Sequence, residues 1–316
     1  MRTLARSTIS VLLLCCGCGG DDSGGDGGPG SSADPTTSPG TDPSGDSTEA
    51  PPTTTDPAPD TTTTDPSATG PEPTDGSDDD SGSTTASGGE PGDWLLTVDA
   101  GTSPSRLMRV DLTGGATEVC TLPATVEYVS FAFTADGTLY GFNAAAARID
   151  AINPCNCSFQ LVGPTSLASL ALERRGAQAD ELLGIDHTLD ALVRVDLATG
   201  LATVIGPLGF FFGPADLAWS DALGAPYAIE GDNDYLYTID PATGAATPGM
   251  PLSEDLTDPG LAVHPNDGLL YACHGDMLST IEAATGLMSP VGALGLTGPC
   301  HTLVAPQTAI ACIDAL

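Results

Sequence analysis

Asp196-Leu-Ala-Thr-Gly200 recurs along the second half of this 316-residue chain as Asp240-Pro-Ala-Thr-Gly244, as Glu282-Ala-Ala-Thr-Gly286 and, shortened, as Asp111-Leu-Thr-Gly114. A degenerate copy begins at Asp150. The acidic residues of consecutive copies lie about 39 to 46 residues apart, and periods of roughly 20–50 residues are typical of solenoids and propellers. The spacing therefore predicts a repeat protein.

Each repeat contains four short apolar runs. A run ending in a polar residue precedes each acidic residue, as in Leu139-Tyr-Gly-Phe-Asn143. Another run lies before it and is often joined to it by a Gly-containing turn such as Asp136-Gly137. A third run carries the acidic residue, and a fourth ends near a corner such as Val162-Gly-Pro164. Four antiparallel strands per repeat are typical of a propeller blade.

We expect an all-β fold, a β-propeller of about five four-stranded blades, because no window shows a capped apolar period of 3.6 residues. The second-strand pattern occurs a sixth time at Ile310-Ala-Cys-Ile-Asp314, while residues 93–316 begin in mid-blade. The C-terminal hairpin is therefore expected to complete the first blade and cover the exposed edges. A six-bladed ring with one incomplete blade is the alternative.

Residues 93–316 resemble the YVTN and NHL-like bacterial propellers. The resemblance is carried by the Asp-Gly turn, the Leu-Tyr strand and the Ile-Asp-x-x-Thr-Gly strand end. It implies the propeller fold and no single activity, because this architecture carries binding scaffolds, hydrolases, lactonases and redox enzymes alike.

Residues 1–18 resemble the signal peptide of bacterial lipoproteins. Two arginines precede a short apolar stretch at residues 8–14, and small residues and cysteines follow it. Cys18 fits best as the cysteine that is lipid-modified, and Cys16 is the lesser candidate. The apolar stretch is too short to span a membrane. The alternative is an ordinary secretory signal.

Residues 19–92 are rich in Gly, Ser, Thr, Pro and Asp and contain no Lys or Arg. Such a segment cannot bury enough apolar surface to offset its ordering entropy, so a disordered linker is expected. Its prolines and like charges favour an extended tether that holds the propeller away from a membrane.

The net negative charge of residues 93–316 disfavours anionic partners. This region has 26 Asp and Glu against six Arg, and the whole chain has no Lys. Nucleic acid and anionic lipid head groups are poor partners, since binding them needs a basic face. Cationic ligands and divalent ions are electrostatically easier, although a solubilising surface explains the charge equally well.

Six cysteines lie outside the signal region, and an even number in an exported protein indicates disulfides. Cys300 and Cys312 are the candidate pair across the last hairpin, with Cys273 near enough to leave other pairings open. Cys120 is a candidate partner for the Cys155-Asn-Cys157 segment. The cysteines lack the paired spacing of a zinc site, so no metal ligand is assigned.

The first candidate site is a column of polar residues at the ends of the second strands: Asp99, Asn143, Asp186, Glu230 and His274. In superposed blades these residues recur around one face of the ring. They are the candidate ring for a ligand or a cation, with calcium as the candidate ion. The alternative is that each side chain caps its own turn.

The second candidate site is the aromatic run Phe210, Phe211 and Phe212, in a loop on the same predicted face. Exposed, these side chains form a patch for a partner; buried, they plug the ring. His187 and His301 lie at strand ends, where lone histidines are more often surface groups than catalysts.

The sequence contains no nucleophile elbow, Walker loop, dinucleotide fingerprint, HExxH or EF-hand spacing, so no catalytic residue is assigned. We expect a lipid-anchored propeller at the bacterial cell envelope, in the outer membrane facing the periplasm or the surface. It would act as a non-catalytic binding module for a protein, glycan or small molecule. The alternatives are a metal-assisted hydrolase or lactonase-like enzyme and a structural envelope protein.

Overall fold

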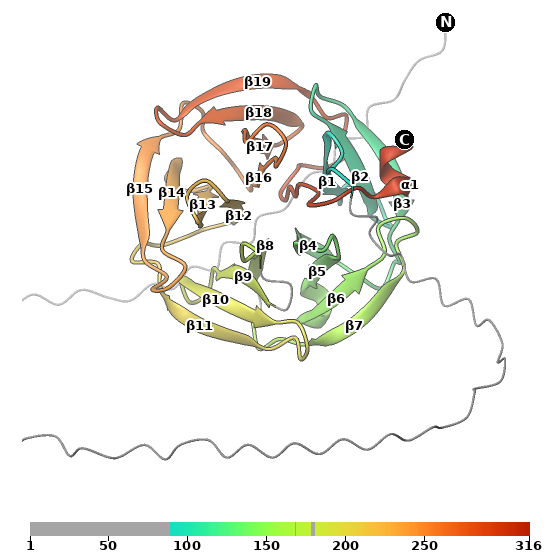
Figure 1. Ribbon diagram of the computed structural model, residues 1–316, viewed down its shortest axis with the longest axis horizontal. Helices are drawn as coiled ribbons and strands as arrows, with labels where there is room; N and C mark the ends of the chain where they lie inside the picture. The colour runs from blue at the N-terminus through green and yellow to red at the C-terminus, as the bar shows by residue number, and fades with distance from the viewer. Residues whose placement is uncertain (1–88, 168, 178–180) are drawn as a thin grey trace, which may run out of the picture. The chain divides into compact units, whose positions relative to one another are not determined.

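The computed structural model describes residues 89–167, 169–177 and 181–316. The expected signal peptide, Cys18 and the expected linker up to residue 88 lie outside the described residues. Five antiparallel sheets are arranged around a common centre (Figure 1). The innermost strands of four sheets are β4, β8, β12 and β16, and β7, β11, β15 and β19 lie at the rim. The all-β propeller with five blades is confirmed.

The strands follow the chain around the ring in sequence order. The first sheet contains β1 (Trp94–Asp99), β2 (Arg106–Asp111) and β3 (Ala116–Thr121). The second contains β4 (Tyr128–Phe133), β5 (Leu139–Asn143), β6 (Arg148–Ile152) and β7 (Phe159–Pro164). The third contains β8 (Leu170–Arg174), β9 (Glu181–Asp186), β10 (Ala191–Asp196) and β11 (Ala202–Pro207).

The fourth sheet contains β12 (Ala215–Ser220), β13 (Ala225–Glu230), β14 (Tyr235–Ile239) and β15 (Ala246–Pro251). The fifth contains β16 (Gly260–Val263), β17 (Leu270–His274), β18 (Met277–Glu282) and β19 (Leu287–Ala293). Two short helices complete the described part of the chain: the 3-10 helix η1 (Ala144–Ala146) and α1 (Ala311–Asp314). Neither these nor any other helix of the described residues is long and apolar enough to cross a membrane.

The repeated Thr-Gly motif closes the hairpin between the third and fourth strands of a blade. In the third blade, the amide of Gly200 donates to the carbonyl of Asp196 at 2.7 Å, and Gly200 has a positive φ of 75°. A Cβ at Gly200 would lie 2.5 Å from the carbonyl oxygen of Gly163, in the Gly-Pro corner of the preceding blade. Glycine is therefore required both by the turn and by the close approach of two blades.

The apolar side chains form five clusters, and each cluster lies between two neighbouring sheets. Trp94 of the first blade packs with Phe131 and Phe133 of the second in one of them. Leu95 of the first blade packs with Tyr271 of the fifth in another, so the ring is closed. Five interfaces between five blades exclude the six-bladed alternative.

The C-terminal residues complete the first blade, as the sequence pattern predicts, but not as a full hairpin. Leu96 in β1 and Val304 exchange both backbone hydrogen bonds, at 2.8 and 3.0 Å, so residues around Val304 take the innermost position of the first blade. The prediction that Ile310–Asp314 forms a strand is wrong. Residues 311–314 form α1, whose Asp314 accepts a 2.7 Å hydrogen bond from Nε1 of Trp94.

Three disulfides connect the first blade and the C-terminal residues to the second and fifth blades. They join Cys120 to Cys157, Cys155 to Cys312 and Cys273 to Cys300. The predicted bond between Cys120 and the Cys155-Asn-Cys157 segment is confirmed, with Cys157 as the partner. The predicted Cys300–Cys312 bond is wrong, because the last residues form a helix instead of a hairpin. Cys312 therefore bonds the second blade, while Cys300 stays beside the fifth.

The last residues before β1 also contact the propeller. The carbonyl oxygen of Gly92 lies 3.0 Å from Nε2 of His264, and the carbonyl of Pro91 accepts a 2.8 Å hydrogen bond from the side-chain Nδ2 of Asn266. Contacts with the propeller therefore begin ahead of residue 93, where the sequence pattern alone places the start of the domain.

Candidate functional site

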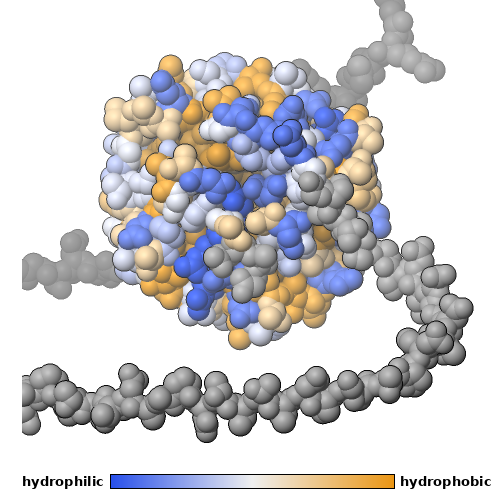
Figure 2. Space-filling model, viewed as in Figure 1, coloured by the Kyte–Doolittle hydropathy of each residue, from blue (hydrophilic) through white to orange (hydrophobic). Residues whose placement is uncertain are grey.

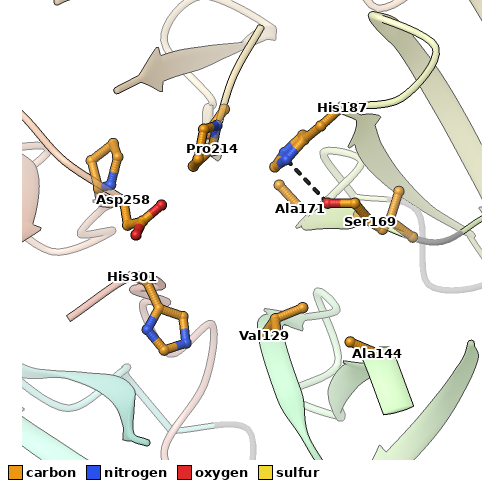
Figure 3. A pocket seen from close by; sticks show the side chains of 11 residues that line it. Val129, Ala144, Ser169, Ala171, His187, Pro214, Asp258 and His301 are labelled. Carbon is orange, nitrogen blue, oxygen red and sulfur yellow. Dashed lines mark hydrogen bonds between the residues drawn. The ribbon is translucent and has the colours of Figure 1, made fainter. Parts of the chain in front are cut away.

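A pocket of about 390 Å³ lies at the centre of one face of the ring. It is formed where the innermost strands begin and where the second strands end (Figure 3). All five blades contribute to it, the first through His301, which precedes the closing segment. The lining residues are Val129, Ala144, Ser169, Leu170, Ala171, His187, Pro214, Ala215, Asp258, Pro259 and His301. Pockets of this size take small ligands.

Ser169 and His187 form a hydrogen-bonded pair on one side of the pocket. The hydroxyl of Ser169 lies 3.2 Å from Nδ1 of His187 (Figure 3). Nε2 of the same ring is buried and has no hydrogen-bond partner among the described residues. Burial lowers the pKa of His187, although Asp186, Asp190 and Asp258 act in the opposite direction. The ring is therefore neutral near pH 7 and has one free nitrogen.

Asp258 and His301 lie on the other side of the pocket (Figure 3). Asp258 is in the loop between β15 and β16 and has a positive φ of 47°, a conformation that Asp adopts more readily than most residues. Its carboxylate has no hydrogen bond to the part of the chain that the structure describes. Nδ1 of His301 lies 3.3 Å from the carbonyl oxygen of Pro299.

Sequence reasoning did not single out Ser169 or Asp258, and it treated His187 and His301 as surface groups. The four side chains come from three blades and become neighbours only when the ring closes. Two lining residues, Ala144 and His187, each directly follow a residue of the predicted polar column. The column is therefore the one local signal for the face on which the pocket lies, but its own residues do not line the pocket.

The polar column itself lies beneath the turns. Asp99 is fully buried and accepts hydrogen bonds from the amides of Gly101, Thr297 and Gly298 and from Arg106, at 2.6 to 3.1 Å. Burial raises the pKa of Asp99, but the hydrogen bonds from Thr297, Arg106 and Gly298 outweigh it and hold the pKa at about 2.

Two further acidic members of the column cap the turns that follow them. Asp186 accepts hydrogen bonds from the amides of Thr188 and Leu189, at 2.7 and 2.9 Å. The two oxygens of Glu230 accept from the amides of residues 232 and 233, each at 2.8 Å. Both side chains are buried. Their geometry matches the alternative of turn-capping groups.

The amide and the histidine of the column have different partners. Asn143 is buried; its Oδ1 accepts from the amide of Glu127 at 3.3 Å, and its Nδ2 lies 3.4 Å from a carboxylate oxygen of Asp150. His274 is partly exposed, with Nε2 3.4 Å from the Glu254 carboxylate. In the described residues, no three His, Cys, Asp or Glu side chains are grouped so that they could hold a metal ion.

The aromatic run is divided between the core and the surface. Phe212 is fully buried and packs on Tyr237, with ring centroids 4.8 Å apart. Phe210 and Phe211 are 42% and 65% exposed. The loop is held by Asp190, whose carboxylate accepts the amide of Phe212 at 2.9 Å. Figure 2 shows hydrophilic residues across the middle of the viewed face, with hydrophobic residues scattered around them.

Comparison with known proteins gives no family. No protein-family model matches the chain, and no curated protein matches it. One similar solved structure is a structural genomics protein of unknown function from Bacteroides thetaiotaomicron, at 14% identity and a TM-score of 0.45, with 63% of this chain and 58% of that chain covered. The chain therefore spans less than two thirds of that protein.

A second similar structure is a chain of a nidogen/laminin complex, at 11% identity and a TM-score of 0.48, with 67% of this chain and 98% of that chain covered. Similarity at this level says nothing about ligands or activity. The propeller is assigned from the five sheets and their five interfaces, and the function must be argued from the pocket.

Proposed function

We propose that the protein is an exported, lipid-anchored propeller that acts as a non-catalytic binding module at the bacterial cell envelope. The central pocket is its ligand site. The observation that carries this proposal is a pocket lined by all five blades that holds a buried histidine nitrogen without a protein partner. Buried polar groups are nearly always hydrogen-bonded, so an unpaired one beside a pocket calls for a partner that a ligand group or a water molecule can supply.

The proposed location is supported by the cysteines and by the N-terminal sequence. Three disulfides indicate an oxidising compartment outside the cytoplasm. Cys18 is the proposed site of lipid attachment, and residues 19–88 have the composition of a tether. In this arrangement, the lipid holds the protein at the membrane while the propeller face is presented to its ligand.

A binding role is favoured over hydrolysis by the orientation of the Ser169–His187 pair. A serine nucleophile needs a histidine base whose other nitrogen is held by a third group. Here the serine contacts Nδ1 of His187, and Nε2 has no such partner in the described part of the chain. The pair orients the ring and leaves its free nitrogen to contact a bound molecule.

The test is native mass spectrometry of the full chain purified from a bacterial envelope in a mild detergent. Ala144 lines the pocket and its neighbour Ala145 is exposed, so Ala144→Trp and Ala145→Trp form a matched pair. We expect a co-purifying small molecule in the natural protein and in Ala145→Trp, and its loss in Ala144→Trp. Equal occupancy in both variants, or a natural protein without any bound mass, would contradict the proposal.

A further inference from the structure

The polar side chains of the pocket are rich in hydrogen-bond acceptors. Nδ1 of His301 faces the carbonyl oxygen of Pro299, and a carbonyl can only accept. Nδ1 therefore carries a proton in this geometry, and Nε2 is an acceptor whenever it carries none. The Asp258 carboxylate is an acceptor as well. When Nδ1–H of His187 donates to Ser169, the free Nε2 of His187 becomes a third.

The pocket lining is also electrostatically one-sided. It contains the carboxylate of Asp258 and contains no Arg or Lys. The surrounding region carries 26 acidic residues against six Arg. A cleft lined by one sign of charge concentrates ligands of the other sign. An anionic ligand would find no cationic partner among these side chains, whereas a cation finds a carboxylate without a competing salt bridge.

The remaining walls are apolar. Val129, Leu170, Pro214 and Pro259 line the pocket together with three alanines. A hydrated metal ion would gain nothing from such walls, and the described residues offer no preformed metal cluster. A ligand with an apolar body and one charged end would contact both the walls and the acceptors.

We propose that the pocket binds a small organic ammonium ion, with Asp258 as its counter-ion and Nε2 of His187 as a further hydrogen-bond acceptor. An ammonium group offers up to three N–H donors, and Figure 3 shows the Asp258 carboxylate and the two imidazole rings around one open space. The inference rests on the proposed function, since it names the class of ligand for the same pocket.

The test uses three probes of nearly the same shape on the full chain. Cyclohexylmethylamine is cationic near pH 7, cyclohexylmethanol is neutral and cyclohexanecarboxylate is anionic. Isothermal titration calorimetry at pH 7 and low salt gives the affinity for each. We expect the amine to bind at least tenfold more tightly than the alcohol, and the carboxylate to bind most weakly. An alcohol or carboxylate that binds as tightly as the amine would overturn the inference.

Two isosteric variants test which carboxylate is the counter-ion of the ammonium group. Asp258→Asn removes the pocket carboxylate and keeps a residue that tolerates positive φ. Asp255→Asn removes an exposed carboxylate of the same loop that does not line the pocket. We expect the amine to lose at least tenfold in affinity for Asp258→Asn, and to bind Asp255→Asn as it binds the natural protein. Equal affinities for the two variants would contradict the role of Asp258.

The Ala144→Trp variant separates the two proposals. If this variant abolishes binding of both amine and alcohol while the natural protein shows no preference for the amine, the pocket is a ligand site but not an ammonium site. The inference then fails and the proposed function stands. If none of the three probes binds, the inference fails, and the mass spectrometry of the natural protein decides the proposed function.

Discussion

Asp99 and Thr297 lie 198 residues apart in the sequence, and Oδ2 of Asp99 accepts hydrogen bonds from both the amide and the hydroxyl of Thr297, at 3.1 and 2.9 Å. Arg106 donates to the same oxygen at 2.6 Å. The buried carboxylate therefore connects the first blade to the segment that precedes Val304, whose backbone pairs with that of Leu96. A residue that the sequence pattern selects as a candidate ligand group takes part in closing the ring.

Asp99→Asn is expected to destabilise the propeller by about 2 kcal/mol at pH 7, because hydrogen bonds to a charged group are lost and Arg106 is left without its buried partner. The pKa of Asp99 is held at about 2, below its ordinary value of 3.8. Its stabilising contribution is therefore complete above about pH 4 and is lost as the pH falls toward 2. Urea unfolding at pH 7, 4 and 2.5 measures this.

The matched control for Asp99→Asn is Asp111→Asn, which removes a half-exposed carboxylate that pairs with Arg109 at 3.0 Å. Such pairs contribute about 0.2–1 kcal/mol. A cost at Asp99 no larger than at Asp111, or one that does not shrink on acidification, would contradict the closing role of Asp99.

Glu173 in β8 is expected to make the propeller less stable as the pH rises. Burial raises the pKa of Glu173 to about 7, against the opposing effect of Arg174, from an ordinary value of 4.5. A raised carboxyl pKa favours folding below about pH 4.5, and this contribution is lost as the pH rises through 7. By linkage, the change is on the order of 3 kcal/mol.

Glu173→Gln should remove that part of the pH dependence and should make the protein more stable than the natural chain at pH 8. Asp216 on the neighbouring strand β12 keeps a pH dependence of the same sign, because burial raises its pKa as well. Glu127→Gln, at an exposed carboxylate, is the control. Thermal unfolding between pH 5 and 8 tests this, and parallel curves for Glu173→Gln and the natural protein would refute it.

The five-bladed ring was predictable because its signals are local. The Thr-Gly turn requires glycine at Gly200, and an acidic residue caps the same turn through its own side chain, as Asp196 does with the amide of Ala198 at 2.8 Å. Each signal lies within a few residues of sequence, so repetition makes it visible. The period of the repeat then implies the blades.

The helical end of the chain and the pocket were not predictable in this way. Ile310–Asp314 has the apolar pattern of a second strand, but its position next to the first blade and its bonds through Cys312 and Asp314 favour a helix. Ser169, His187 and Asp258 become neighbours only across blades. Contacts between residues far apart in sequence leave no periodic signal in a single chain.

The disulfide between Cys155 and Cys312 is expected to stabilise the closed ring more than the other two. It joins residues 157 positions apart, against 37 and 27 for the others. From the loss of unfolded-chain entropy, such a link is worth about 5 kcal/mol at most. The double variant Cys155→Ser/Cys312→Ser should lose a large part of this in urea unfolding, with Cys120→Ser/Cys157→Ser losing less.

Peptide mapping of the non-reduced protein tests the pairing directly. We expect a peptide that links Cys155 to Cys312 and another that links Cys273 to Cys300. A peptide that links Cys300 to Cys312 would restore the hairpin expected from the sequence and would contradict the helical C-terminal segment.

Membrane attachment is expected to depend on Cys18. Cys18→Ser should move the protein from the membrane fraction to the soluble exported fraction, because lipid modification of a cysteine requires its thiol. Cys16→Ser removes the neighbouring candidate and should leave the protein in the membrane fraction. Immunoblots of the two fractions measure this. Release by Cys16→Ser alone would indicate that Cys16 is the lipid-modified residue. Release by neither variant would contradict lipid anchoring.

The aromatic loop provides a matched pair of substitutions on adjacent residues. Phe212 is fully buried against Tyr237, so Phe212→Ala should destabilise the propeller by about 3–5 kcal/mol through the lost burial and the cavity left behind. Phe211 is 65% exposed, so Phe211→Ala should change the stability by less than about 0.5 kcal/mol. Urea unfolding of the full chain measures both.

The same pair tests whether the exposed half of the loop contributes to ligand binding. Phe211 does not line the pocket, so Phe211→Ala should bind cyclohexylmethylamine as the natural protein does. A large loss of affinity in a variant that stays fully stable would indicate that the ligand binds nearer to the rim of the ring than to its centre. The exposed aromatic ring would then be the surface that contacts a larger partner, because an exposed apolar side chain that affects binding without affecting stability lies in an interface.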